Sequence, residues 1–406
     1  NEIKAALLGA GTVGGGVYKL IEKRKSEMPS KIQAELTITK VLVKNLNKKR
    51  EGIPDEVLTD DWQEILDDQE ISIVIELMGG IEPARTYILE ALKAGKNVVT
   101  ANKDLLAEHG KELMDAAEEY HKDLYFEAAV GGGIPIIRPL KECLAGNNIT
   151  EVMGIVNGTT NYILTKMTQE GMDFGEALKQ AQELGFAEAD PTADIEGIDA
   201  GRKVAILASV AFNSRVTLDN VHIEGITKIT PADMEYAKEL GMTIKLLATS
   251  RRIGDSFYAM VAPFLVGQSS PLYSVNDVFN AVFVHGNMLG DAMFYGSGAG
   301  KLPTASAVVG DIVDAAKHLH VNIVTNWNST PAVLKPLDEV TGKFFVRIKK
   351  EAAEEAKKVF GDVEIISLGQ LPQECAFITD EMTQGAFEEK LAQIGDQVLA
   401  KIRVKD

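Results

Sequence analysis

The chain has 406 residues, of which 45% are hydrophobic, so it can bury a sizeable core and is longer than one ordinary domain. Its formal net charge of −17 disfavours nucleic acid and anionic membranes as partners, because both would repel most of its surface. Since its two cysteines form no CxxC pair and no apolar run is long enough to span a membrane, we expect an untargeted cytoplasmic protein of two or three domains without zinc or disulfides.

The N-terminal third alternates short apolar runs with amphipathic segments. The predicted strands are residues 3–8, 36–43, 71–76, 97–100 and 124–128, and the predicted helices include residues 13–25, 84–94 and 104–120. Strands of nearly continuous Val, Ile and Leu that alternate with helices are typical of a parallel sheet covered on both faces. We therefore expect an α/β fold that begins with a doubly wound, Rossmann-type nucleotide-binding domain over residues 1–132.

A glycine run, Gly131 to Gly133, ends this alternation, and a second domain is predicted over residues 133–301. Its strands are residues 149–156, 243–252, 258–263 and 281–284, and its helices are residues 160–170, 174–184 and 199–212. The longer, alternating strands favour an antiparallel α+β domain. The amphipathic stretch that follows, assigned to residues 302–325, is predicted to be a helix that returns to the first domain.

The end of the chain is predicted to be a small separate module. Residues 326–341 are rich in Asn, Thr and Pro and are interpreted as a linker. Within residues 342–406, the predicted strands are 344–349, 363–368, 375–379 and 398–404, and the predicted helices are 350–360 and 385–394.

The first predicted strand runs into a GxGxxG motif, Gly9-Ala10-Gly11-Thr12-Val13-Gly14, that opens a helix. In a dinucleotide-binding loop the first glycine makes the tight turn, and the second, here Gly11, lets the backbone approach a pyrophosphate. The third, here Gly14, permits close packing of helix and strand. The strand–turn–helix setting favours this function over a glycine turn that merely joins two elements.

The end of the second predicted strand indicates which nicotinamide cofactor is preferred. NAD-selective sites usually place an acidic residue there to bind the ribose hydroxyls, whereas this strand ends in Lys44, and Lys48, Lys49 and Arg50 follow. We therefore predict that NADPH is preferred over NADH and that Lys44 binds the 2′-phosphate. The alternative is a solvated basic loop.

A second glycine cluster, residues 296–301, does not match the phosphate-binding GxxxxGK motif. A loop that closes over the cofactor and a plain turn are both compatible with it.

Two segments carry candidate proton donors for a hydride-transfer reaction. Lys103 follows the fourth predicted strand, at the edge of the sheet where ligands bind, although a surface lysine would look the same. Asp199 and Lys203 are four residues apart at the start of a helix, so they share a face and can pair. An acidic loop with an ordinary helix-capping ion pair is the alternative for this second segment.

The second of these segments resembles the signature of the homoserine dehydrogenase family. The matching positions are Ala181, Gly185, Glu188, Asp190, Pro191, Asp194, Gly197, Asp199 and Lys203. The resemblance also covers residues 9–14, 100–103, 127–134, 157–162 and 296–303, and so spans nearly all of residues 1–325. It implies reversible, NAD(P)H-dependent reduction of L-aspartate 4-semialdehyde to L-homoserine, in threonine, methionine and isoleucine biosynthesis.

The resemblance also implies residue roles. Lys203 would be the catalytic acid and base, with Lys103 beside the nicotinamide and substrate; the substrate would be held by Glu188 and Asp199, while Asp194 would sit in the substrate site and orient the lysine. Cofactor positions would be Gly9, Gly11, Thr12, Val13, Gly14, Lys44, Gly79, Lys103, Gly185 and Gly300. Main-chain oxygens of Glu127, Val130, Gly132 and Ile134 would hold a sodium ion, and the central domain would form a homodimer or homotetramer.

Members of this family often end in an ACT domain, a ferredoxin-like βαββαβ module, and the predicted order of elements in residues 342–406 is similar to it. The first predicted strand runs directly into Glu351-Ala352-Ala353 and lacks the Asp-x-Pro-Gly-Val-Leu loop that grips an amino acid. The resemblance therefore implies a degenerate ACT-like module, which leaves feedback by threonine open beside a role in subunit contacts.

Other functions remain as alternatives. Another amino-acid dehydrogenase, acting on aspartate or diaminopimelate, would share the nucleotide domain but not the signature of residues 181–203. A cofactor-sensing regulatory protein would need neither Lys103 nor Lys203. A phosphorylating semialdehyde dehydrogenase needs a nucleophilic cysteine, and Cys143 lies in an apolar, helix-like segment.

Overall fold

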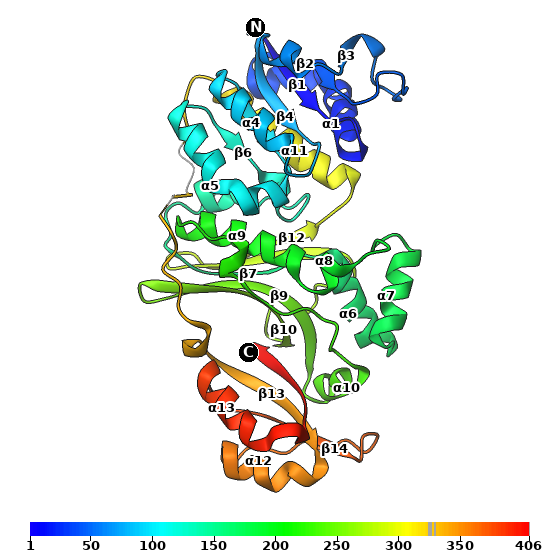
Figure 1. The fold of residues 1–406 in the computed structure, drawn as a ribbon, viewed down its shortest axis with the longest axis vertical. Helices are drawn as coiled ribbons and strands as arrows, with labels where there is room; N and C mark the ends of the chain where they lie inside the picture. The colour runs from blue at the N-terminus through cyan, green and yellow to red at the C-terminus, as the bar shows by residue number, and fades with distance from the viewer. Residues whose placement is uncertain (324–326, 329, 406) are drawn as a thin grey trace.

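The structure is a computed structural model that describes residues 1–323, 327–328 and 330–405. Residues 324–326, 329 and 406 lie outside the described residues; they fall at the end of the predicted returning helix, in the predicted linker and at the end of the predicted module. Figure 1 shows an elongated molecule, with the N-terminal part at the top, a large sheet across the middle and the C-terminal part at the bottom.

The N-terminal part is a parallel sheet in the order β3-β2-β1-β4-β5-β6. Its elements are β1 (Glu2–Leu8), α1 (Thr12–Lys23), α2 (Met28–Ile32), β2 (Glu35–Leu42), β3 (Leu58–Thr59), α3 (Trp62–Leu66), β4 (Ile71–Glu76), α4 (Ala84–Lys93), β5 (Asn97–Thr100), α5 (Lys103–Glu119) and β6 (Leu124–Tyr125). The strand order changes direction between β1 and β4, so the carboxyl ends of these two strands border the crevice where ligands bind in such folds. The predicted Rossmann-type fold is confirmed.

Alternate residues of β1 show why this sheet is covered on both faces. Leu7 is buried in the core that contains Val17 of α1, whereas Leu8 is buried in the core that contains Leu105 of α5. The first core also takes in Val308 of α11 (Lys301–Lys317), which returns from the central part of the chain and packs against α1.

β6 is shorter than the predicted strand over residues 124–128. It ends at Tyr125 because Glu127–Ala129 form a 3₁₀ turn. The Glu127 carboxylate accepts hydrogen bonds from the amides of Ile136, Ile137 and Arg138, which holds the chain in this turn.

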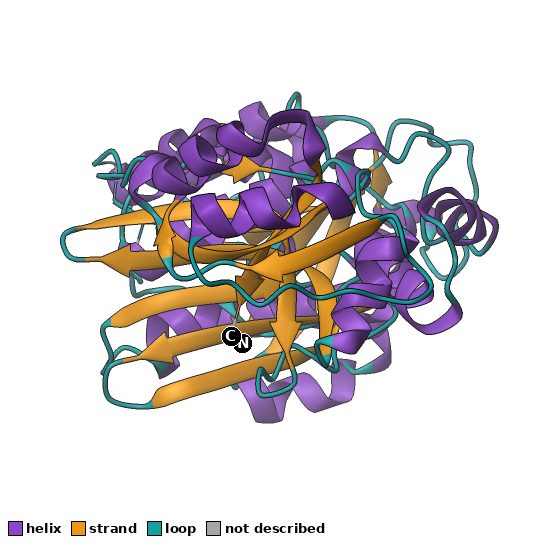
Figure 2. Ribbon diagram, turned by 90° about the horizontal axis from the view of Figure 1, so that it is seen from below, coloured by secondary structure: helices purple, strands orange, loops and turns teal. Residues whose placement is uncertain are grey.

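The central part is built on a large sheet in the order β12-β11-β7-β9-β10-β16-β13-β14, in which β12 to β10 are paired antiparallel. Its elements are β7 (Ile149–Ile155), α6 (Gly158–Glu170), α7 (Phe174–Glu183), α8 (Thr192–Ile195), α9 (Ile198–Phe212), β8 (His222–Ile223), α10 (Pro231–Glu239), β9 (Met242–Ile253), β10 (Ser256–Gly267), β11 (Phe279–Gly286) and β12 (Gly290–Ser297). Helices α6 and α9 pack against the sheet, as expected for the predicted α+β class. Seen from below, the strands lie side by side with helices packed around them (Figure 2).

The C-terminal part adds strands to this same sheet. Its elements are β13 (Thr341–Lys349), α12 (Ala353–Phe360), β14 (Glu374–Ile378), β15 (Met382–Thr383), α13 (Gln384–Ile394) and β16 (Val398–Lys405). The order β16-β13-β14 is that of a ferredoxin-like sheet. β16 also pairs in parallel with β10, where Leu265 faces Val404, so the sheet runs on into the central part.

The predicted strand over residues 363–368 is reduced to an isolated bridge. Ile366 and Ala376 exchange two backbone hydrogen bonds of 2.7 and 3.0 Å, which gives the ferredoxin-like order its fourth position. The chain does not extend the pairing, because turns at Gly361–Val363 and Leu368–Leu371 lead it away on either side.

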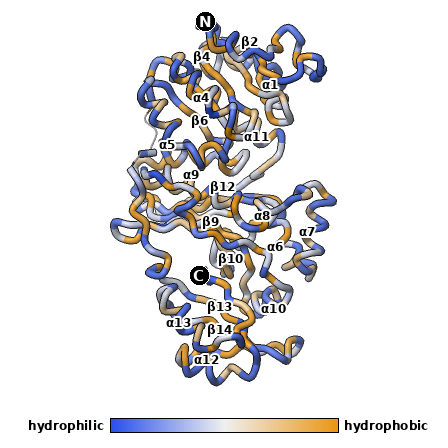
Figure 3. Tube along the Cα trace, viewed as in Figure 1, coloured by the Kyte–Doolittle hydropathy of each residue, from blue (hydrophilic) through white to orange (hydrophobic). Residues whose placement is uncertain are grey.

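Hydropathy follows this architecture. Apolar residues run along the strands and hydrophilic residues dominate the outer loops (Figure 3). In the described part of the chain, no helix is long and apolar enough to cross a membrane.

Candidate active site

The glycine loop after β1 has the geometry that its sequence predicts. Gly9 has φ +95, and a Cβ atom on Gly14 would collide with the carbonyl oxygen of Gly9, so neither position tolerates a side chain. A Cβ on Gly11 would meet nothing within 4 Å, so the backbone there is open to a ligand. Helix α1 begins at Thr12, next to Val13, and its N-terminus faces this open side.

A cavity of ≈ 640 Å³ lies over this loop, at the carboxyl ends of β1, β2 and β4. Gly9, Gly11 and Gly79 line it on one side. Lys44, two residues past the end of β2, also lines the cavity, and Lys48 and Arg50 follow. Arg50 is held in place because its guanidinium donates to the carbonyls of Asn45 and Lys48 at 3.0 and 2.7 Å. The cavity therefore joins an anion-binding helix end to a basic rim.

Three charged side chains meet between the nucleotide-binding part and the central part. Lys103 Nζ lies 2.5 Å from Asp199 Oδ1, and Lys203 Nζ lies 2.8 Å from Asp199 Oδ2. Lys103 is the first residue of α5, while Asp199 and Lys203 belong to α9, and these two helices pack together across the boundary (Figure 1). The predicted Asp199–Lys203 pair is present, and the carboxylate also bridges to Lys103.

Local sequence explains how these groups are presented. The Asn102 side chain accepts a hydrogen bond from the Leu105 amide and so caps α5 directly before Lys103. Asp199 lies in the first turn of α9, where a negative charge is favourable, and Lys203 lies one turn further along the same face. The rest of that helix is strongly apolar and buried, which draws Lys203 inside.

Asn157 completes the cluster and was not among the predicted site residues. Its amide nitrogen donates to Asp194 at 2.7 Å and to Asp199 at 2.9 Å, while its carbonyl oxygen accepts from the Thr160 amide and caps α6. Asp194 is thereby tied to the cluster. The sequence signal that could have identified Asn157 is the Asn-Gly pair after a buried strand. A residue at this place can cap the next helix and lies at the same edge of the sheet as the site.

The surroundings give the two lysines different acid strengths. Burial lowers the pKa of Lys203, and the charge of Lys103 lowers it further, whereas Asp199 opposes both effects. Burial also acts against the charge of Lys103, but the adjacent Asp199 outweighs it and raises the pKa of Lys103. For Asp199, burial opposes ionisation, and the two lysines nevertheless hold its pKa far below the usual range.

In the described part of the chain, the other predicted site residues form no hydrogen bond or ion pair with this cluster. Glu188 and Gly185 are exposed, and the Glu188 backbone carbonyl accepts from Gln182 at 3.0 Å. Gly300 has φ +113 and directly precedes α11, whose first residue, Lys301, lies beside Gly16 of α1.

The predicted cation loop is a buried turn with unused carbonyl groups. In the described residues, no hydrogen bond ends on the backbone oxygens of Val130, Gly132 or Ile134, although these residues are buried. The Glu127 side chain is taken up by backbone amides, and no cluster of three or more His, Cys, Asp or Glu side chains in this described part could hold a metal. Main-chain oxygens are thus the groups that fit a cation here.

Comparisons with known proteins identify the family. The homoserine dehydrogenase NAD-binding domain matches residues 9–127, and the homoserine dehydrogenase domain matches residues 135–313. The homoserine dehydrogenase of Bacillus subtilis is 43% identical over 411 residues, which cover 97% of this chain and 95% of that protein. The chain belongs to the homoserine dehydrogenase family.

Solved structures agree with this assignment. The homoserine dehydrogenase of Thiobacillus denitrificans superimposes with a TM-score of 0.92 at 36% identity and covers 100% of this chain and 99% of that one. A hyperthermophilic archaeal homoserine dehydrogenase in complex with NADPH gives a TM-score of 0.66 at 30% identity, over 78% of this chain and 98% of that one.

Homoserine dehydrogenases are NAD(P)-dependent oxidoreductases that act on a CH–OH group, so the predicted enzyme class is confirmed. The match decides for this family over the other amino-acid dehydrogenases. The family match also decides against a cofactor sensor, and Lys103 and Lys203 both pair with one carboxylate.

Proposed function

We propose that this homoserine dehydrogenase uses Lys203 as the general acid and base in the reversible reduction of L-aspartate 4-semialdehyde to L-homoserine. The observation that carries the proposal is the hydrogen bonding of its ammonium group. Among the described residues it donates to the Val156 carbonyl at 2.6 Å and lies 2.8 Å from Asp199, which leaves one of three N–H groups for a substrate oxygen. Its lowered pKa suits repeated proton transfer.

The neighbouring groups have complementary roles in this proposal. The nicotinamide supplies or accepts the hydride when the cofactor is bound. Lys103 stays protonated and stabilises negative charge on the substrate oxygen, while Lys203 donates the proton in reduction and takes it back in oxidation. Asp199 and Glu188 hold the substrate, whose ammonium and hydroxyl groups need acceptors, and Asp194 acts through Asn157 to keep Asp199 in place.

The test is absorbance at the reduced-nicotinamide band with L-homoserine plus NADP or NAD at alkaline pH. We expect a rise with homoserine and none with aspartate or diaminopimelate. Lys203→Ala should lose most of the turnover, about 100-fold or more, and still bind the cofactor. An active Lys203→Ala enzyme would move the proton-donor role to Lys103.

We further propose that NADPH is preferred over NADH. The support is the basic rim of the cofactor cavity, where Lys44 stands at the position of the usual acid, and the NADPH bound in the archaeal relative. Lys44→Ala should raise the KM for NADPH about tenfold or more while changing the KM for NADH less than about threefold. Equal effects on both cofactors would contradict the assignment of Lys44 to the 2′-phosphate.

The loop over residues 127–134 is our proposed site for sodium. Its support is the set of buried carbonyls at Val130, Gly132 and Ile134 that lack donors in the described residues. With Glu127 contributing through its main-chain oxygen, these groups would supply hard oxygen ligands, and the ion would fix the loop beside the junction of the two domains.

We also propose a homodimer or homotetramer formed through the central domain. β12 is an end strand of the large sheet, and exposed apolar side chains gather on it and its hairpin: Met288, Leu289, Met293, Tyr295 and Phe279. An open strand edge with such side chains is suited to a second copy of the chain. A cytoplasmic location completes this part of the proposal.

The domain division remains a proposal: a nucleotide-binding domain over residues 1–132 with the returning segment at 302–325, whose helix α11 ends at Lys317 instead of spanning the segment, a central domain over 133–301, a linker over 326–341 and an ACT-like module over 342–406. The ferredoxin-like strand order supports the module. The module shares a sheet with the central domain, which favours a role in contacts between subunits. Feedback by threonine is the alternative role.

A further inference from the structure

Two of the crossings that the chain makes between the nucleotide-binding and central domains touch each other. The first passes through Gly131–Gly133 and the second through residues 297–300. The Gly133 amide donates to the Ser297 carbonyl at 3.0 Å, and a Cβ on Gly132 would collide with the Gly298 carbonyl. The crossings therefore form one compact junction in which the backbones lie against each other.

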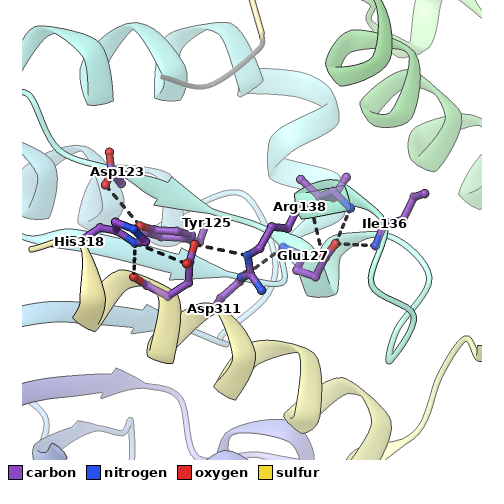
Figure 4. Close-up of polar contacts among 9 residues, drawn as sticks. Asp123, Tyr125, Glu127, Ile136, Arg138, Asp311 and His318 are labelled. Atoms are coloured by element: carbon purple, nitrogen blue, oxygen red, sulfur yellow. Dashed lines mark hydrogen bonds and ion pairs between the residues drawn. The ribbon is translucent and has the colours of Figure 1, made fainter. Parts of the chain in front are cut away.

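A buried ionic cluster fastens this junction to α11 (Figure 4). Asp311 of α11 is 2% exposed, and its two carboxylate oxygens accept from the Glu127 amide at 2.9 Å and from the Arg138 guanidinium at 2.6 Å. Arg138 Nε also lies 3.3 Å from Asp314. Because the Glu127 carboxylate accepts the amides of residues 136–138, both ends of the glycine loop are tied to each other and to one carboxylate.

The cluster of Glu127, Arg138 and Asp311, called the clamp below, lies on elements that pack against both halves of the active site. Helix α11 packs on α1, which carries the nucleotide loop, and on β5, the strand that precedes Lys103. On the other side, the turn that follows Arg138, Pro139–Cys143, packs on α9, which carries Asp199 and Lys203. A shift at the junction would therefore change how the two halves face each other.

Burial energetics favour a geometric role for the clamp. A buried ion pair loses so much hydration that well-packed apolar residues would stabilise the fold equally well or better. What a carboxylate and a guanidinium add is directional hydrogen bonding that fixes orientation.

We propose that Asp311 and Arg138 are positioning residues for hydride transfer. They fix the relative orientation of the nucleotide-binding domain, which carries Lys103, and the central domain, which carries Lys203. They also hold the loop of residues 130–134 in place. Because this loop is the proposed sodium site, an effect of the clamp on sodium binding rests on that earlier proposal.

The test is Asp311→Asn in the full-length enzyme, with L-homoserine deuterated at C4. If the clamp sets the reacting geometry, kcat should fall about tenfold or more, the primary isotope effect on kcat should rise, and KM should change less than about threefold. Arg138→Lys, which keeps the charge but loses the planar fork, should show the same pattern more weakly. Its fold is less at risk, so it provides a second reading if Asp311→Asn is unstable.

Asp233→Asn is the matched control. Asp233 is 1% exposed and pairs at 2.8 Å with the buried Arg347, between α10 and β13 and away from the junction. It should lower the unfolding temperature but leave the isotope effect unchanged. An unchanged isotope effect in both junction variants, or the same change in Asp233→Asn, would overturn the proposal.

A second readout does not depend on activity. The unfolding temperature is compared in sodium chloride and in choline chloride at equal ionic strength, and the stabilisation by sodium should shrink in Asp311→Asn but persist in Asp233→Asn. If the unaltered enzyme shows no such stabilisation, the sodium site fails, and the isotope effect then decides on the clamp by itself.

Discussion

Two lysines at the active site share one carboxylate and differ in burial. Lys203 is buried and its pKa is lowered first by loss of hydration and then by the charge of Lys103. Lys103 is more exposed, and Asp199 raises its pKa despite partial burial. Since a proton donor works best when its pKa lies near the working pH, this difference supports the proposal that Lys203 exchanges the proton while Lys103 keeps its charge.

Asp199→Asn tests this division of roles. If Lys203 is the base in homoserine oxidation, as proposed, it must be neutral, so the rate of oxidation should rise as pH increases through the pKa of Lys203. The substitution removes the group that raises that pKa, which should therefore fall further. We expect the rising limb of the kcat profile to move to lower pH, with kcat about 10-fold or more below the unaltered enzyme. A limb that stays in place or moves to higher pH would contradict the assignment. Glu170→Gln removes an exposed carboxylate that pairs with Lys166 on α6, so this control should leave the limb in place.

At the same scale, the sequence could predict residues whose partners are close in the chain or whose motif is distinctive. Asp199 and Lys203 are one helical turn apart, and their pairing follows from that spacing. Asp311 lies 173 positions from Arg138 and 184 from Glu127, and no periodicity brings such residues together. The clamp was therefore visible only in the structure.

Among the elements, the glycine loop at residues 131–133 makes a contact in the structure that the sequence did not predict. In the sequence it marked a break between domains, and the cluster at residues 296–301 was compatible with a closing loop or a plain turn. The structure packs the two against each other, with Gly132 at φ +55 and without room for a methyl group beside Gly298. The predicted end of the strand over residues 124–128 was wrong, because the Glu127 carboxylate accepts backbone amides and so turns the chain after β6.

Gly132→Ala measures how tight this contact is. The substitution strains a positive φ and also drives a methyl group into the Gly298 carbonyl, so the free energy of unfolding should fall by about 2–4 kcal/mol in urea titrations. Gly171→Ala is the matched control, because Gly171 has φ +67 and nothing within 4 Å of its added Cβ. It should cost about 1 kcal/mol. Equal losses in the two variants would show that backbone strain, and not the contact between loops, accounts for the effect.

For the whole molecule, hydrophobic patterning predicted the parallel sheet and the antiparallel class of the centre, and the family resemblance implied the ferredoxin-like order at the end. It did not predict that β16 pairs with β10, because a strand's pattern shows which face is buried and not which distant strand it joins. The C-terminal module, expected to be separate, thus shares a sheet with the central domain. The seam between them is the pairing of β16 with β10, and Arg403 of β16 forms an ion pair with Glu224 across it.

Arg403→Met should loosen this seam. Burial opposes the charge of Glu224, and His222 and Arg403 together hold its pKa at about 2, so loss of Arg403 leaves a half-buried carboxylate with less support. We expect the single calorimetric unfolding transition to split, with the C-terminal module unfolding at lower temperature after a loss of about 1–3 kcal/mol. Lys401→Met is the control, since Lys401 on the same strand pairs with Glu388 inside the module. If both variants keep one transition at similar temperatures, β-sheet pairing alone holds the seam; if both split, the module is coupled too weakly for the Arg403 pair to matter.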